Sequence, residues 1–220
     1  MNCRISCMNP FTFTTVMRSK PSPVLPGTIG LVLCGGQSSR MGADKSLLVY
    51  HDKPQRYHVY EMLQSVCGHV YISCRHSQAE GVAPGYHCLT DDHRYHHTGP
   101  MAALLTAFEK FPGKHVLLVG CDYPFLRLQE LQDFCGLLPA GKPVAFYNEA
   151  AGLFEPLLAW YPYSCYKNLQ VIQQQHQYSL KHFLMESEAV AYIPADKNSI
   201  RSVDTEEDFD QVKGLIRGGL

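Results

Sequence analysis

A short apolar run that stops at two adjacent glycines constrains the fold of this chain more than any other feature. Residues Ile29–Cys34 are almost wholly apolar and are followed directly by Gly35 and Gly36. A strand without a polar face is typical of a parallel sheet that is covered by helices on both sides. The run therefore predicts a buried strand, and the glycines after it allow a ligand to approach the backbone closely.

Further apolar runs follow at intervals that suit an α/β fold. His69–Cys74 and His115–Val119 predict buried strands, and Tyr86–Leu89 predicts a shorter one. Between and after them, apolar residues at helical spacing predict helices over 54–67, 100–110 and 127–138. Strands that alternate with helices form βαβ units. The chain is therefore expected to be a three-layer α/β/α protein with a mostly parallel, Rossmann-like sheet.

The pattern changes after Pro143. Val144–Tyr147 and Gly152–Trp160 flank a turn-forming segment and predict a hairpin-like excursion. The segments that follow predict two helices, a strand and a last helix, over 162–176, 179–185, 190–193 and 205–216. Thr205 and Asp208 have the spacing of a helix cap.

The first 27 residues differ in composition from the remainder. They contain several prolines, serines and threonines and lack the continuous apolar core of a signal peptide. We expect residues 1–27 to be a flexible extension and residues 28–220 to form a single domain, a size that one domain accommodates.

Composition excludes several classes of function. The formal net charge of −1 argues against a nucleic-acid partner, and no apolar run approaches the length of about 18 to 20 residues that a membrane helix needs. The nine cysteines are odd in number and include no CxxC pair, so buried reduced thiols explain them better than disulfides or a zinc site. A cytoplasmic location is expected.

The loop after the first strand carries the strongest chemical signal. Ser38 and the backbone amides can bind phosphate oxygens, and Arg40 and Lys45 can neutralise their charge. The alternative is a glycine-rich turn with two solvated cations. The loop fits neither the GxxxxGK[ST] nor the GxGxxG pattern. We interpret it as a phosphate-binding loop of another kind.

Acidic residues follow two of the other predicted strands. Asp122 comes directly after the strand ending near Val119, where its carboxylate suits Mg²⁺, although a turn or capping role is the alternative. Asp91 and Asp92 precede Gly99 and the helix that opens with a proline. They are candidates for a ligand contact, and the alternative is that they lie in an exposed polar loop. The intervening histidines lack the spacing of a metal site.

Residues Leu33–Lys45 resemble the signature LAGGxSxRMGxDK of the MobA-like nucleotidyltransferases, with Cys34 in place of the usual alanine. The resemblance extends, with weaker motifs, from about residue 28 to residue 217. It implies the nucleotidyltransferase fold, and it implies that nucleotide is bound by Leu33, Cys34, Gly35, Gly36, Ser38, Lys45, Ser73, Asp92 and Asp122. At Ser73 the family has an asparagine, which a serine copies only in part.

The same resemblance implies the activity. MobA-like enzymes transfer GMP from GTP to molybdenum-bound molybdopterin and release pyrophosphate, which implies GTP, molybdopterin, Mg²⁺ and partner enzymes that deliver or receive molybdopterin. Its catalytic residues would be Arg40, Lys45 and Asp122, with Asp122 as metal ligand and Asp204 as a possible second one. Glycine at position 35 resembles the guanine-using branch. The alternatives are a cytidylyltransferase, a sugar-phosphate nucleotidyltransferase and a nucleotide-binding protein without activity.

Overall fold

The computed structural model describes residues 4–6, 25–34, 45–139, 141–203 and 205–217. The described strands are β1 (Arg4–Ser6), β2 (Leu25–Leu33), β3 (Cys67–Cys74), β4 (Cys88–Thr90), β5 (His115–Gly120), β6 (Val144–Asn148), β7 (Leu153–Tyr161) and β8 (Val190–Ile193). The described helices are α1 (Gln55–Gln64), α2 (His76–Ala79), α3 (Pro100–Lys110), α4 (Leu128–Cys135), α5 (Cys165–Gln174), α6 (Leu180–Glu186) and α7 (Glu206–Arg217). Three short 3-10 turns join them: η1 (Lys45–Leu47), η2 (His93–Tyr95) and η3 (Lys197–Ile200).

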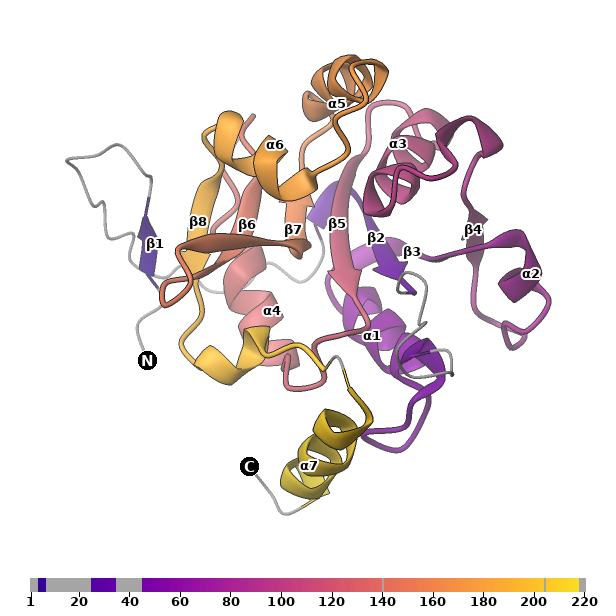
Figure 1. The fold of residues 1–220 in the computed structure, drawn as a ribbon, viewed down its shortest axis with the longest axis vertical. Helices are drawn as coiled ribbons and strands as arrows, with labels where there is room; N and C mark the ends of the chain where they lie inside the picture. The colour runs from indigo at the N-terminus through magenta and orange to yellow at the C-terminus, as the bar shows by residue number, and fades with distance from the viewer. Residues whose placement is uncertain (1–3, 7–24, 35–44, 140, 204, 218–220) are drawn as a thin grey trace.

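The strands form one sheet in the order β1-β8-β6-β7-β5-β2-β3-β4 (Figure 1). Neighbours β5, β2, β3 and β4 are parallel, as are β6 and β8, whereas β7 and β1 run antiparallel to their neighbours. The expected mostly parallel sheet is confirmed, because the central strands are joined by helical crossovers that return the chain to the same edge.

Helices cover both faces of the sheet, which confirms the three-layer architecture. Helices α1 and α4 pack in one apolar cluster with one face, and helices α3, α5 and α6 pack in a second cluster with the other. Alternate residues of β2 enter the two clusters: Leu31 faces the second and Val32 the first. Both side chains are fully buried, so the wholly apolar run on β2 follows from its position between two helical layers.

The predicted hairpin is present as β6 and β7, but it lies inside the sheet. Strand β7 pairs antiparallel with both β6 and β5, so the hairpin completes the sheet between β8 and β5. The pairing slips within β7, since Ala145 is opposite Ala159 while Phe146 is opposite Glu155. Residues 156–158 therefore form a bulge, and the Tyr161 hydroxyl donates a 2.9 Å hydrogen bond to the carbonyl oxygen of Pro156 within it.

The chain before the predicted domain boundary contributes to the sheet. Residues Arg4–Ser6 pair with β8, and β2 begins at Leu25, three residues before the expected start of the domain. The division between residues 27 and 28 therefore cuts through β2. The remainder of the expected extension lies outside the described residues.

The final helix is held by the cap that the sequence indicates. The Asp208 amide donates to the Thr205 hydroxyl and the Thr205 amide donates to the Asp208 carboxylate, each at 3.1 Å.

In the described part of the chain no helix has the length and apolar character needed to cross a bilayer. The cysteines described there are free thiols, and all but Cys88 are buried.

Candidate active site

The ends of three parallel strands lie level with one another at one edge of the sheet. Leu33 is the register partner of both Ser73 on β3 and Gly120 on β5. Past the strands the pairing continues: the Cys121 amide donates to the Leu33 carbonyl oxygen at 3.1 Å and the Cys34 amide to the Ser73 carbonyl oxygen at 3.4 Å. The residues predicted on these strand ends are therefore brought together, at the edge where open α/β sheets bind ligands.

Lys45 and Asp122 are connected through one residue near the end of the chain. The Lys45 ammonium donates a 3.0 Å hydrogen bond to the carbonyl oxygen of Val203. The Val203 amide in turn donates to the Asp122 carbonyl oxygen at 3.1 Å. The backbone of the segment before α7 therefore links the lysine that ends the glycine-rich motif to the acidic residue that follows β5.

A small apolar cluster holds this segment in place. Tyr50, Val203 and Val212 are buried together, and the Tyr50 ring meets the Phe209 ring edge-on with centroids 5.0 Å apart. Burial, and then the nearby Asp122 carboxylate, raise the pKa of the Tyr50 hydroxyl, which stays neutral. Helix α7 is thereby packed against the segment after Lys45, through Leu48 and Tyr50, and against Phe125 in the loop that follows β5 (Figure 1).

On the other side of β2, Ser73 pairs with Asp91. The Ser73 hydroxyl donates a 3.0 Å hydrogen bond to the Asp91 carboxylate. Burial raises the pKa of Asp91, because desolvation outweighs the hydrogen bond that favours the charged form. A polar pair is thus placed at the ends of β3 and β4, next to the end of β2.

Asp92, the residue predicted to contact the nucleotide, lies in another environment. Its carboxylate accepts hydrogen bonds from both the backbone and the guanidinium of Arg94, which also bonds Glu109 at 2.6 Å. The Arg94 hydrogen bonds hold the pKa of Asp92 well below its usual range. The structure brings Asp91, and not the Asp92 side chain, to Ser73, because successive residues of an extended chain point in opposite directions.

A cleft of about 530 Å³ lies beside the edge strand β4 and helix α3. It is lined by Cys88, Leu89, Thr90, Asp92, Arg94, Thr106, Glu109 and Lys110. Within the cleft the Arg94 guanidinium bonds the carboxylates of both Asp92 and Glu109. Neither Lys45 nor Asp122 lines the cleft. We therefore place the candidate site at the strand ends and not in this cleft.

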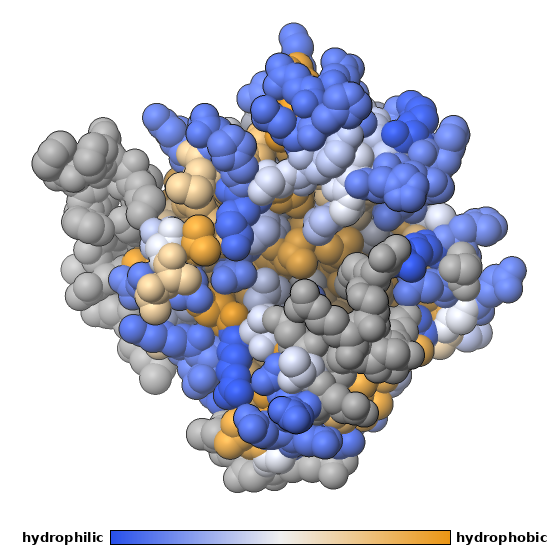
Figure 2. Space-filling view, viewed as in Figure 1, coloured by the Kyte–Doolittle hydropathy of each residue, from blue (hydrophilic) through white to orange (hydrophobic). Residues whose placement is uncertain are grey.

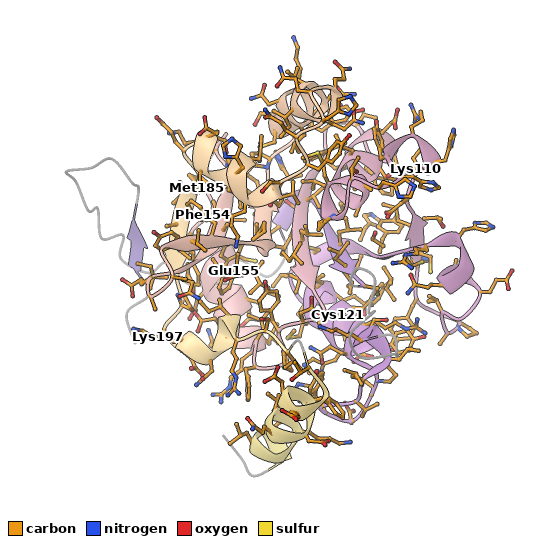
Figure 3. The ribbon with its side chains drawn as sticks, in the orientation of Figure 1. Lys110, Cys121, Phe154, Glu155, Met185 and Lys197 are labelled. Carbon is orange, nitrogen blue, oxygen red and sulfur yellow. The ribbon has the colours of Figure 1, made fainter. Side chains whose placement is uncertain are left out.

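A second hydrogen-bonded pair of side chains lies on the β7 side of the sheet edge. The Tyr123 hydroxyl donates a 3.0 Å hydrogen bond to the half-buried Glu155 carboxylate. Burial raises the pKa of Glu155, against smaller opposing effects of that bond and of Lys181 on α6. Figure 3 shows Glu155 on β7 and Cys121 after β5 on the same face of the molecule. An apolar patch bordered by hydrophilic surface occupies the centre of this face in Figure 2.

Several predicted residues lie outside the described part of the chain: Gly35, Gly36, Ser38, Arg40 and Asp204. The sequence pointed to Asp91 and Asp92 as a pair but indicated Asp92 for the nucleotide contact, and it gave no role to Tyr123 or Val203, which the structure also brings to the site. Tyr123 adjoins Asp122, which was the available signal. Val203 acts through its backbone, which leaves no signal in the residue type.

The fold and the edge site define this chain as an α/β nucleotidyltransferase. Its fold is that of molybdopterin-guanine dinucleotide biosynthesis protein A from Archaeoglobus fulgidus, with a TM-score of 0.70 over 86% of this chain and 99% of that one, at 22% identity. Residues 30–190 match the MobA-like NTP transferase domain, and the chain belongs to this family.

Two curated relatives are similar in sequence. A molybdenum cofactor biosynthesis bifunctional protein of Synechocystis sp. is 33% identical over 136 residues, which are 58% of this chain and 39% of the relative. A molybdenum cofactor guanylyltransferase of Histophilus somni is 25% identical over 187 residues, 84% of this chain and 95% of the relative. The chain thus spans well under half of the first relative and nearly all of the second.

Proposed function

We propose that this protein transfers GMP from GTP to the phosphate of molybdenum-bound molybdopterin and releases pyrophosphate. The observation that carries the proposal is the linkage of Lys45 and Asp122 through Val203 at the sheet edge, within a chain of the MobA-like family. A cation and a carboxylate beside a glycine-rich loop are what a triphosphate and its metal ion require. The relative from Histophilus somni is named a molybdenum cofactor guanylyltransferase.

The nucleotide is proposed to lie over the ends of β2, β3 and β4. Gly35, Gly36, Ser38 and Arg40 would surround its phosphates together with Lys45, as the motif implies. Leu33 and Cys34 lead into this loop, and Ser73 lies level with Leu33. From the β4 side we assign the contact to the Asp91 carboxylate, which the Ser73 hydroxyl already orients at 3.0 Å. Asp92 is the competing assignment.

Asp122 is proposed as the Mg²⁺ ligand. Mg²⁺ usually takes one or two protein carboxylates and completes its octahedral shell with phosphate oxygens and water, so one carboxylate after β5 fits the ion. Within the described residues no cluster of three or more histidine, cysteine, aspartate or glutamate side chains forms a cage for a metal, which agrees with a site completed by substrate. When bound, the ion would neutralise phosphate charge and polarise the α-phosphorus.

The chain's own residues would act by positioning and by charge. An acceptor phosphate oxygen forms a bond to the α-phosphorus of GTP while the bond to the bridging oxygen breaks, and pyrophosphate leaves with that electron pair. Lys45 and Arg40 would stabilise the charge that develops on the leaving group. Two anions must be brought together, so holding them at adjacent strand ends supplies much of the rate.

The guanine assignment rests on Gly35 and on the relatives' activity. A glycine there leaves room beside the base that an alanine would reduce. A thermal-shift series with GTP, CTP and UTP in magnesium buffer tests it, since a ligand at 100 times its dissociation constant stabilises the folded state by about 2.7 kcal/mol. GTP alone is expected to raise the melting temperature, and a larger rise with CTP would reassign the protein as a cytidylyltransferase.

The partners and the compartment are proposals as well. Substrate molybdopterin would be delivered, and the product received, by other enzymes of the cofactor's synthesis and use. The buried free thiols of the described chain suit a reducing compartment such as the cytoplasm.

Calorimetry and a pyrophosphate assay test the proposal together. We expect GTP to bind in magnesium buffer, and pyrophosphate to appear once molybdenum-bound molybdopterin is added. Asp122→Asn should abolish the magnesium dependence of both, whereas the exposed Asp52→Asn should behave as wild type. GTP binding without pyrophosphate release would leave a nucleotide-binding protein without transferase activity. An absence of triphosphate binding by the folded protein would refute the assignment.

A further inference from the structure

Glu155 lies on the side of Asp122 that the proposed nucleotide leaves open. The candidate nucleotide residues follow β2, β3 and β4, all on one side of β5 in the strand order. Strand β7 is the neighbour of β5 on the other side, and its Leu158 pairs with Val119 near the end of β5. Because β7 runs antiparallel, Glu155 lies beyond that end, where its carboxylate meets Tyr123, the residue after Asp122.

The bulge in β7 positions this glutamate. Residues 156–158 are accommodated between two pairs of the β6–β7 ladder, and Tyr161 holds the Pro156 carbonyl oxygen at 2.9 Å. Leu157 lies so close to Gly120 that a Cβ built on the glycine would be 3.2 Å from the Leu157 Cβ. The bulge is therefore packed against the end of β5, and bulges of this kind commonly redirect a side chain beside an active site.

The Glu155 carboxylate is only partly satisfied by the protein. The Tyr123 hydroxyl bonds Oε2, and among the described residues no further hydrogen bond to the carboxylate and no cation within 4.0 Å of it is present. Lys181 acts on it only at longer range. Each carboxylate oxygen accepts two hydrogen bonds, so both oxygens retain capacity for a ligand. A half-buried carboxylate without a counter-charge lowers stability and is characteristic of a binding site.

The acceptor of the proposed reaction presents a matching group. A pterin ring carries an N3–H and a 2-amino group side by side, and a carboxylate accepts both in a bidentate arrangement. We propose that Glu155, held by Tyr123, is the residue that recognises the pterin ring of the acceptor through this edge. The inference rests on the proposed function. It assigns the β7 side of the sheet edge to the acceptor, while the β2–β4 side holds the nucleotide.

Guanine carries the same pair of donors, so the test must separate the two ligands. We would titrate the full chain with free pterin by fluorescence and with GTP by calorimetry, and measure KM for both substrates. Glu155→Gln offers one acceptor and one donor in place of two acceptors. It should weaken pterin binding and raise the acceptor KM by about 10- to 100-fold, the value of a lost charge-assisted hydrogen bond, and leave the KM for GTP unchanged.

Two variants serve as controls. Glu149→Gln makes the same chemical change at the exposed turn of the β6–β7 hairpin and should bind both ligands as wild type. Glu155→Asp keeps both acceptor oxygens and should lose less pterin affinity than Glu155→Gln. A merely structural role for Glu155 would instead change both KM values together.

Each outcome bears on one proposal. Wild-type pterin binding by Glu155→Gln, with GTP binding intact, overturns the role of Glu155 and leaves the proposed function standing. The role of Glu155 is also overturned if this variant loses at least as much GTP affinity as pterin affinity. The carboxylate would then bind guanine or stabilise the fold. Failure of wild-type protein to bind GTP rejects the proposed function, while the pterin titration still decides whether Glu155 binds that ring.

Discussion

The Lys45 ammonium and the Val203 carbonyl oxygen are joined by a 3.0 Å hydrogen bond across 158 positions of the chain. Because the Val203 amide also donates to the Asp122 carbonyl oxygen, the backbone of one residue connects the Lys45 side chain to the backbone of Asp122. Removing the Lys45 side chain should therefore have two effects. It would eliminate the proposed phosphate contact, and it would release the segment before α7 from its anchor.

Lys45→Ala is expected to lower kcat by about 10²- to 10³-fold, the usual effect of removing one donor that stabilises a developing anion. The free energy of unfolding should fall by about 1–3 kcal/mol, because a charge-assisted hydrogen bond is lost. Activity assays and urea denaturation measure the two effects. The exposed Lys142→Ala, which breaks a surface ion pair with Glu188, should change neither by much. Wild-type turnover in Lys45→Ala would remove this residue from the mechanism.

Asp91 and Asp92 can be separated by the same substitution at each position. Asp91→Asn should weaken GTP binding about 10-fold or more, since it removes a carboxylate that Ser73 orients at the strand ends. Asp92→Asn should leave GTP affinity nearly unchanged, because it disturbs an ion pair with the exposed Arg94. Calorimetry in magnesium buffer decides between them. The reverse ranking would return the nucleotide contact to Asp92.

Tyr161→Phe tests the bulge of β7. The variant leaves the Pro156 carbonyl oxygen without the buried hydroxyl that bonds it, at a cost of about 1–2 kcal/mol in the free energy of unfolding. If the bulge positions Glu155, the acceptor KM should rise while the KM for GTP stays the same. Tyr178→Phe removes an exposed hydroxyl that contacts His176 and is the matched control. Equal acceptor KM values in the two variants would contradict a positioning role.

Glu155→Gln should make the protein more stable at neutral pH. Burial raises the folded-state pKa of Glu155 above its ordinary value of 4.5, so the folded state binds its proton more tightly than the unfolded chain does. The resulting penalty appears as the pH rises from 4.5 through the raised pKa, and it is absent below 4.5. The melting temperature of the variant should exceed that of wild type at pH 7 and converge with it in acid. A constant difference at every pH would rule out this origin.

His58 predicts the opposite pH dependence. Burial, and then the stacked His51 ring at 3.9 Å, lower the pKa of His58 from 6.5 to about 4. The folded state therefore binds fewer protons than the unfolded chain between these values, and stability is lost as the pH falls from 6.5 towards 4. His58→Phe keeps a ring against His51 and should flatten the melting temperature in this range. The exposed His69→Phe should keep the acid sensitivity of wild type.

Local pattern was enough to predict most of the fold. The apolar run on β2 reports burial on both faces, and Pro100 and the helical spacing after it bound α3 as the structure has it. The hairpin was also predicted, but its place inside the sheet was not, because strand order depends on pairings between distant segments that periodicity does not encode. The early start of β2 and the pairing of β1 with β8 were missed for the same reason.

The sequence by itself determined the chemistry available at the edge of the sheet: a glycine-rich loop ending in Lys45, and an acidic residue after a buried strand. Only the tertiary structure decided which neighbours share that edge. It placed Asp91 and not Asp92 beside Ser73, brought Glu155 to Tyr123 across 32 positions, and joined Lys45 to Asp122 through Val203. The type of a residue determines what its side chain can bind. Strand register, side-chain direction and the path of the chain determine which neighbours it contacts, and these three depend on how the whole core packs.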